Sequence, residues 1–278
     1  MGKRSDLPLL LRILLSLTRN LPPVWRISGI SNRIVKPFWC AYGKNGMLEL
    51  PIWGTIRMRV DPCEVVGGNL AFIPHLYDRW ERVMLRQVLS TGGIFVDVGS
   101  NIGAYALWAA QWVGEAGKVL ALEADPDNFK LLQENIRLNQ LDSTIIAVHA
   151  GVSDHHESLK LYRNDLCNKG GHSFIIKKSE DFIEIACSPL IDLVKASGVQ
   201  RIDVMKLDVE GFEERILTQY FQDVPEESAL RPRYLLVEIN GGPITDLPAR
   251  QRFKELLCAV GYVLVRDEEN SLFKRISL

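Results

Sequence analysis

The feature that constrains the fold most is a strand-like run that breaks into a glycine loop, over residues 94–103. The run Ile-Phe-Val-Asp-Val is followed by Gly-Ser-Asn-Ile-Gly, and a helical pattern of small and aromatic residues starts at Tyr105. Glycines just after a strand allow the backbone to approach a ligand closely, and the helix that follows directs free N–H groups toward it. The segment predicts the first strand–loop–helix unit of an α/β domain, with a ligand at the loop.

The acid near the end of this strand, Asp97, indicates the kind of ligand. A carboxylate there repels a pyrophosphate and attracts a cationic amino-acid group, such as the methionyl end of S-adenosylmethionine (SAM). The dinucleotide fingerprint requires Gly-x-Gly-x-x-Gly, whereas here Gly99 is followed by Ser100 and Asn101. The loop therefore favours a SAM site over a dinucleotide site.

The chain beyond Leu76 alternates between strand-like and helix-like segments, which predicts a parallel sheet with helices on both faces. The predicted strands cover residues 94–98, 118–123, 144–148, 158–162, 204–208, 234–239, 262–266 and 271–276, and the predicted helices 77–89, 127–139, 188–196, 212–220 and 248–260. The last two strands form a hairpin in this prediction. The expected fold is a Rossmann-like, mostly parallel seven-stranded sheet with a C-terminal antiparallel hairpin.

Residues 1–75 are predicted to be an extension to a domain of residues 76–278. Within it, residues 1–37 resemble a helical arm, and residues 38–75 contain short strands that pair as a half-exposed antiparallel hairpin. Residues 1–59 carry ten Lys and Arg against two acids, or +8, so the remainder carries −9 of the total of −1. The apolar stretch 7–17 is shorter than the roughly 20 residues of a bilayer crossing, so it either packs on the body or lies on a membrane surface.

The cysteine pattern and the charge distribution limit the cellular location and the binding partners that we expect for the protein. The five cysteines are odd in number and never spaced as Cys-x-x-Cys, which argues against a disulfide scaffold or zinc cluster and predicts buried thiols in a reducing cytosol. A cytoplasmic protein is expected, with peripheral membrane contact through the basic arm left open. The acidic body argues against a nucleic-acid partner. No pattern in the chain indicates an oligomeric state.

A second carboxylate, Glu123, ends the second predicted strand, 20 residues after the glycine loop. At this spacing an acid accepts hydrogen bonds from the ribose hydroxyls of a nucleoside cofactor. Ala124 and Asn128 follow as further predicted cofactor contacts, although helix capping alone also explains Asn128. Val152 and Ser153 are predicted to form a turn after the third strand that meets the adenine.

The second motif is Lys-Leu-Asp-Val-Glu-Gly at residues 206–211. Lys206, Asp208 and Glu210 share one side if the segment is extended. Three charges along an otherwise apolar strand are costly to bury unless they are paired or used. Either the lysine and the first acid form a structural ion pair, or the two acids face the crevice beside the reacting groups.

Taken together, Val96–Gly103 and Lys206–Gly211 resemble the FkbM family of SAM-dependent O-methyltransferases, over roughly residues 90–265. The resemblance implies a class I methyltransferase fold and methylation of a hydroxyl on a sugar, glycan, polyketide or other secondary metabolite. It implies cofactor contacts at Asp97, Gly99, Asn101, Gly103 and Glu123, to which we add Ser100 and Asp208. It also implies reaction-site roles for Lys206, Asp208 and Glu210, to which we add Glu238. Where the family often has a histidine after the fifth strand's glutamate, this chain has Ile239 and Asn240.

The expected chemistry leaves the proton acceptor open. A sugar hydroxyl is a weak acid, so the reaction needs either a carboxylate base, Asp208 or Glu210, or a metal ion. Oxygen ligands from Asp208, Glu238 and Asn240 would suit Mg²⁺. His172, in a glycine-rich loop that suits an acceptor-binding flap, is an alternative base.

Other readings of the same residues remain. Tyr77 and Trp80, just before the glycine loop, are placed to cover the cofactor, and the His155-His156 pair is expected at the surface. The acceptor is alternatively a lipid-linked molecule, RNA or protein, and a degenerate SAM-binding module without catalysis is a further alternative. A short-chain reductase is disfavoured because no Tyr-x-x-x-Lys sequence occurs in the chain.

Overall fold

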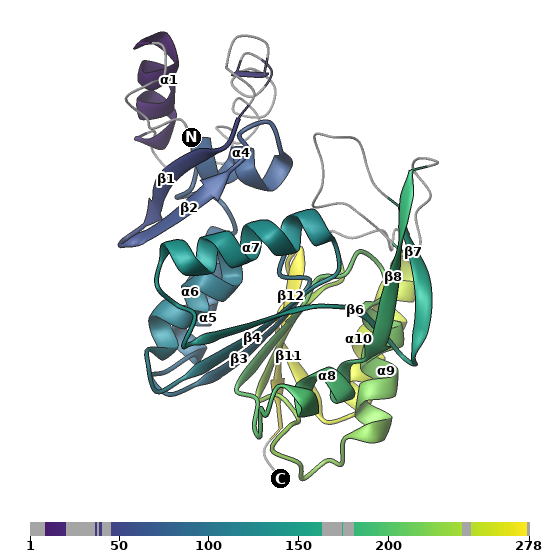
Figure 1. Ribbon diagram of the computed structural model, residues 1–278. Coiled ribbons are helices and arrows are strands. Elements are labelled where there is room, and N and C mark those ends of the chain that lie inside the picture. Colours follow the sequence, from purple (N-terminus) through teal and green to yellow (C-terminus); the bar gives the residue numbers. More distant parts are fainter. Residues whose placement is uncertain are drawn as a thin grey trace.

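The computed structural model describes residues 9–20, 37, 39–40, 46–162, 174, 181–240 and 246–276. Its centre is a seven-stranded sheet in the order β11-β12-β10-β9-β3-β4-β5 (Figure 1). The strands are β3 (Ile94–Val98), β4 (Lys118–Glu123), β5 (Ile145–His149), β9 (Val204–Leu207), β10 (Tyr234–Glu238), β11 (Tyr262–Arg266) and β12 (Asn270–Arg275). Only β12 runs antiparallel to its neighbours in this sheet. The predicted class I methyltransferase fold, with its C-terminal hairpin, is confirmed.

Helices cover both faces of this sheet (Figure 1). One face carries α5 (Arg79–Val88), α6 (Ala104–Val113) and α7 (Pro126–Leu138), and the other carries α8 (Leu190–Ala196), α9 (Glu213–Asp223) and α10 (Leu247–Ala259). Successive side chains of β3 alternate between the two cores, with Phe95 on the first side and Val96 on the second. Because both faces are covered, the central strands are mostly apolar runs, with Asp97 in β3 and Lys206 in β9 as exceptions, which is why the sequence pattern located them well.

The N-terminal extension contains α1 (Leu9–Arg19), the antiparallel pair β1 (Leu48–Trp53) and β2 (Ile56–Val60), and α4 (Val65–Phe72). The predicted helix and hairpin are confirmed, but the prediction missed α4 because Gly67 and Gly68 lower helix propensity. Gly67 is required there, since a Cβ atom would lie 2.1 Å from the carbonyl oxygen of Asp61. The hairpin and α4 share one hydrophobic core with α6 and α7. A domain boundary at residue 75 stays a prediction.

Asn135 of α7 and Asn139, which caps the end of that helix, bind the free edge of β2. The side chain of Asn139 accepts a hydrogen bond from Arg57 N (2.9 Å) and donates to Arg57 O (2.7 Å). Asn135 does the same for Arg59 N (2.7 Å) and Arg59 O (3.3 Å), and its amide also donates to Ile102 O (2.9 Å). Side-chain amides thus replace a neighbouring strand. Fully buried Asn135 connects the extension to the glycine loop.

A second, three-stranded sheet, in the order β6-β8-β7, lies beside the main one. It consists of β6 (Gly151–Ser153), β7 (Glu157–Tyr162) and β8 (Phe182–Pro189). The predicted turn at Val152 and Ser153 is wrong, because these residues pair with β8 as a strand. The helix predicted from residue 188 begins later, since β8 extends to Pro189.

The cysteines differ from the prediction. Cys40 and Cys63 form a disulfide, so the argument against disulfides was wrong for this pair. Cys187 is a buried free thiol as expected, whereas Cys258 is exposed. Cys167 lies outside the described residues. Across the described residues, no helix is long and apolar enough to cross a membrane.

Candidate active site

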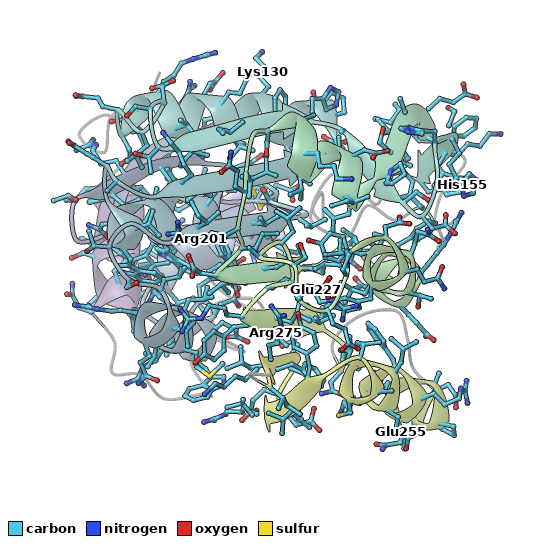
Figure 2. The ribbon with its side chains drawn as sticks, turned by 90° about the horizontal axis from the view of Figure 1, so that it is seen from below. Lys130, His155, Arg201, Glu227, Glu255 and Arg275 are labelled. Atoms are coloured by element: carbon cyan, nitrogen blue, oxygen red, sulfur yellow. A yellow bond between two sulfur atoms is a disulfide. The ribbon has the colours of Figure 1, made fainter. Side chains whose placement is uncertain are left out.

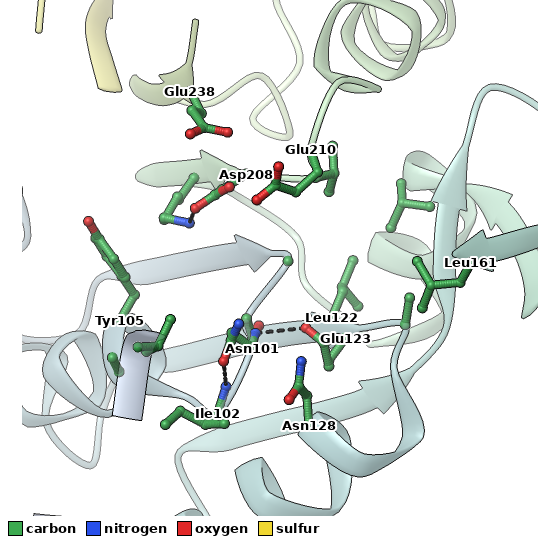
Figure 3. Close-up of a pocket in the computed structure, with 18 of the residues that line it drawn as sticks. Asn101, Ile102, Tyr105, Leu122, Glu123, Asn128, Leu161, Asp208, Glu210 and Glu238 are labelled. Atoms are coloured by element: carbon green, nitrogen blue, oxygen red, sulfur yellow. Dashed lines mark hydrogen bonds and ion pairs between the residues drawn. The ribbon is translucent and has the colours of Figure 1, made fainter. Parts of the chain in front are cut away.

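A cleft with about 1130 Å³ of empty space, part of it open to solvent, lies at the carboxyl ends of β3, β4, β9 and β10 (Figure 3). The carboxyl ends of parallel strands are where open α/β sheets bind ligands. The predicted site residues that line the cleft are Gly99, Ser100, Asn101, Glu123, Ala124, Asn128, Val152, Lys206, Asp208, Glu210 and Glu238. Three other predicted cofactor contacts, Asp97, Gly103 and Ser153, are not among its lining residues.

The glycine loop is folded tightly against the end of β9. Gly99 has a φ of 81°, and a Cβ atom on it would lie 1.9 Å from the carbonyl oxygen of Asp208. The backbone N–H groups of Gly99 and Ser100 both donate to Leu122 O, at 3.0 and 2.9 Å. Glycine is therefore needed at position 99 to bring the two strand ends together. Gly103 instead precedes α6 with a φ of 96°, and a Cβ atom there would lie 2.6 Å from Leu132 Cδ1.

Glu123 connects the loop to the end of β4. Its Oε2 accepts a hydrogen bond from Asn101 N (2.7 Å), and its Oε1 accepts one from Asp125 N (2.9 Å). Burial raises the pKa of Glu123 to about 7, against the opposing effect of these two N–H groups. Each carboxylate oxygen has room for a second hydrogen bond. The side chain is thus held rigidly in the cleft wall with acceptor capacity to spare.

Asp97 is fully buried beneath this loop, in register with Lys206 of β9. Neither of its carboxylate oxygens has a hydrogen-bond partner among the described residues. Burial raises the pKa of Asp97 to about 6, although the ammonium of Lys206 lowers it. The predicted contact between Asp97 and the cofactor stays a prediction, because the carboxyl group lies under the cleft floor.

The opposite end of the cleft is acidic (Figure 3). Asp208, Glu210 and Glu238 bring carboxylate oxygens within 4.8 Å of one another. The pKa of Glu238 is raised to about 9. Burial is the largest cause, and the negative charges of Asp208 and Glu210 act in the same direction. Glu238 therefore holds a proton at neutral pH, and its Oε2 has no hydrogen-bond partner among the described residues.

Among the described residues, one buried cation, Lys206, faces this acidic end. The Lys206 side chain is 2% exposed, and its Nζ donates to Asp208 Oδ2 at 2.9 Å. The same Nζ lies 4.6 Å from the centre of the Tyr105 ring, and the Tyr105 hydroxyl donates to Asp78 Oδ2 at 2.9 Å. The ion pair considered from the sequence is present, and its acidic partner also lines the cleft. The ion-pair reading is therefore confirmed for Asp208, and its role beside the reacting groups stays a prediction.

Two sequence expectations about this end need correction. The motif is not one extended segment, because β9 ends at Leu207 and Glu210 adopts a φ of 55°. Asn240 does not join the acidic cluster, since its amide donates to Asp267 Oδ1 (2.8 Å) and its oxygen accepts from Lys254 Nζ (3.3 Å). The turn after β9 places Glu210 in the cluster with Asp208 and Glu238 instead.

Of the two residues predicted to meet the adenine, only one lines the cleft, and its contact with adenine stays a prediction. Val152 lines the cleft, but the Ser153 hydroxyl donates to Glu157 Oε1 at 2.5 Å. Neighbouring residues of a strand point to opposite sides, so only one of the pair faces the cleft. The expected surface position of His155 and His156 is confirmed, and Figure 2 shows His155 at the outer edge of the molecule. His172 lies outside the described residues.

Several cleft residues were not found from the sequence. Val65 and Val66 enter from α4 of the extension, and Leu161 and Phe174 form part of the opposite wall. No local motif distinguishes these apolar residues from core residues. Tyr77 lines the cleft as expected, whereas Trp80 does not, because its ring packs under the Arg266 guanidinium.

Comparisons with known proteins bear on this site. The family described as "Methyltransferase FkbM domain" matches residues 97–264. The hexuronic acid methyltransferase AglP of Haloferax volcanii is 28% identical over 170 residues, which is 59% of this chain and 64% of that protein. The chain thus matches less than two thirds of that relative's length.

A second relative, the methyltransferase sdnD of Sordaria araneosa, is 26% identical over 214 residues, which is 64% of this chain and 77% of that protein. Among solved structures, TYW2 of M. jannaschii in complex with AdoMet (SAM) is 16% identical with a TM-score of 0.43, covering 84% of this chain and 89% of that one.

Proposed function

The chain belongs to the FkbM methyltransferase family, and on that premise we propose that it is a SAM-dependent methyltransferase that methylates a hydroxyl group of a sugar or glycan. One observation carries the proposal. A single cleft has Glu123 at one end and the Asp208–Glu210–Glu238 cluster at the other (Figure 3). The described activity of the Haloferax volcanii relative, a hexuronic acid methyltransferase, supports a sugar as the acceptor.

The residues of the cleft fit SAM. In this proposal Glu123 accepts hydrogen bonds from the ribose hydroxyls, for which each of its oxygens has spare capacity. Val152, Leu161 and Phe174 offer apolar surface to the adenine. The loop at Gly99 admits close approach of the methionyl part, and the buried charge of Asp97 favours its ammonium group. When bound, SAM supplies a methyl group on a sulfonium, activated for attack by oxygen.

In this proposal the acidic end of the cleft binds the acceptor, orients its hydroxyl group and removes the proton. Lys206 fixes the Asp208 carboxylate through the 2.9 Å hydrogen bond, so the side chain is held for an incoming hydroxyl. We assign proton removal to Asp208 or Glu210, a role that contributes about 10²–10⁴-fold in rate. Glu238 holds its proton at neutral pH and therefore acts as a hydrogen-bond donor that orients the acceptor. Orientation of the oxygen toward the methyl group contributes at least as much as the base.

A divalent cation is the alternative to a carboxylate base. Asp208, Glu210 and Glu238 offer hard oxygen donors close enough to share one ion. Mg²⁺ held there would lower the pKa of the acceptor hydroxyl and would displace the proton of Glu238. The carboxylate base is favoured, because Asp208 already has a cationic partner in Lys206.

Calorimetric titration with SAM, followed by methyl transfer to a panel of sugars and uronic acids, tests the proposal. We expect SAM to bind the wild-type protein and the Asp208→Asn variant alike, and methyl transfer by that variant to fall about 100-fold or more. Transfer that persists in EDTA supports the carboxylate base, and loss in EDTA with recovery in Mg²⁺ supports the cation. Absence of SAM binding, or transfer to RNA or protein with none to sugars, would overturn the proposal. We also propose a cytoplasmic location, with the Cys40–Cys63 disulfide as the observation that counts against a reducing compartment.

A further inference from the structure

The helix α1 is held by one side and exposes apolar residues on the other. Leu15 and Thr18 are buried where α1 packs against α4. Leu9, Ile13 and Leu17 are 70%, 47% and 61% exposed. Residues four apart lie above one another on a helix, so these three side chains form one continuous stripe that faces water. A stripe of this kind on a helix that is otherwise docked indicates a surface that binds something.

The orientation of α1 is fixed at its end. The Arg19 guanidinium donates hydrogen bonds to Leu70 O and Ala71 O, the latter at 2.8 Å, and to Pro51 O. Leu70 and Ala71 lie in the last turn of α4, where the helix dipole favours a cation. The helix therefore cannot roll its exposed stripe inward without breaking these bonds.

The net charge of the sequence segment that includes α1 indicates the partner. Residues 1–36 contain seven Lys and Arg and one acid, which gives +6 in the segment that includes α1. A basic segment with an apolar helical face is the composition that binds anionic membrane surfaces. A second copy of this chain fits poorly, because pairing two α1 stripes would bring two +6 segments together.

We propose that the Leu9–Ile13–Leu17 face of α1 docks on an anionic lipid surface. The helix lies in the membrane interface in this arrangement, since at 11 residues it is too short to cross a bilayer. The helix that carries this face packs on α4, as Figure 1 shows, and α4 contributes Val65 and Val66 to the cleft. If the methyl-transfer proposal also holds, acceptors carried on membrane lipids would reach the cleft most readily. The docking itself does not depend on that activity.

Sedimentation with vesicles of phosphatidylglycerol and phosphatidylcholine tests the docking with the full-length chain. We expect the wild-type protein to sediment with the anionic vesicles, and its bound fraction to fall as salt is raised to 0.5 M. The double variant Ile13→Asp/Leu17→Asp should bind at least about tenfold more weakly. The matched control is Val263→Asp/Val265→Asp on β11, which changes two aliphatic residues of 47% and 52% exposure with the same change in charge. This control should bind as the wild type does.

Each outcome decides the proposal. It is overturned if the wild-type protein does not sediment with anionic vesicles, or if the α1 and β11 variants lose vesicle binding equally. It is also overturned if light scattering shows a dimer that the α1 variant dissociates while vesicle binding is absent. Thermal unfolding of both variants confirms that each is folded. Because vesicle binding is measured without acceptor or SAM, failure here leaves the proposed methyl transfer untouched, and failure of methyl transfer leaves the docking untouched.

Discussion

Replacement of Asn135 by alanine should damage both stability and cofactor binding, because this side chain joins two parts of the molecule. Its amide accepts from Arg59 N at 2.7 Å and donates to Arg59 O at 3.3 Å in β2 and to Ile102 O at 2.9 Å in the glycine loop. The side chain is fully buried, so water does not replace it easily. The alanine variant leaves these three backbone groups without a partner.

The magnitude follows from these contacts. A typical hydrogen bond contributes about 1 kcal/mol net, and a buried polar group left unpaired costs about 1–3 kcal/mol. Three lost bonds therefore lower the free energy of unfolding by about 3–5 kcal/mol. At about 2–4 °C per kcal/mol, the midpoint of thermal unfolding falls by roughly 6–20 °C. SAM affinity should fall about tenfold, since Ile102 lies in the loop that forms the cleft wall.

Asn139→Ala is the matched control for this prediction. Asn139 makes the same two bonds to Arg57 and donates to Asn135 O at 2.7 Å, but it is only half-buried and has no bond to the glycine loop. We expect it to lose about 1 kcal/mol or less and to bind SAM as the wild type does. Differential scanning calorimetry measures stability, and titration calorimetry measures SAM affinity. Equal effects of the two substitutions on both measurements would refute the reasoning.

Two further predictions concern the buried charges. The raised pKa of Glu238, about 9 against an ordinary 4.5, means that its contribution to stability is full below pH 4.5 and is lost as pH rises through 9. Urea unfolding of the wild type should therefore weaken from pH 5 to pH 9, and Glu238→Gln should flatten that slope; a slope unchanged in the variant would contradict the raised pKa. Lys206→Met removes the cation beside Asp97 and Asp208 and should cost about 3–5 kcal/mol, with partial recovery when Asp208→Asn is added. Thermal unfolding measures the stability of the single variant and of the double variant. A double variant less stable than Lys206→Met would exclude the ion pair as the cause.

Most of the catalytic sheet could be predicted from the sequence. Strand β4 was located to the residue at Lys118–Glu123, because strands buried on both faces are continuous apolar runs. The glycine loop and Glu123 were found because their spacing is set by one strand–loop–helix unit. The acids at Asp208 and Glu210 were found because charges beside a central strand are unusual. These signals are all local.

What the sequence could not predict depends on contacts between distant segments. Val65 and Val66 reach the cleft only because the extension packs on α7, which no local pattern encodes. Cys40 and Cys63 pair across 23 residues without a recognisable spacing. Glu210 enters the acidic cluster through a positive φ in the turn after β9, whereas a period-two pattern predicted a straight strand. Burial of Asp97 under the loop likewise depends on the fold as a whole.

A crystal structure with bound S-adenosylhomocysteine tests the central claim most directly. The account predicts that the ribose hydroxyls lie within hydrogen-bonding distance of the Glu123 carboxylate. It also predicts that the sulfur atom faces the end of the cleft formed by Asp208, Glu210 and Glu238. A ligand bound elsewhere, or in this cleft with its sulfur directed toward Val152 and Phe174, would contradict it.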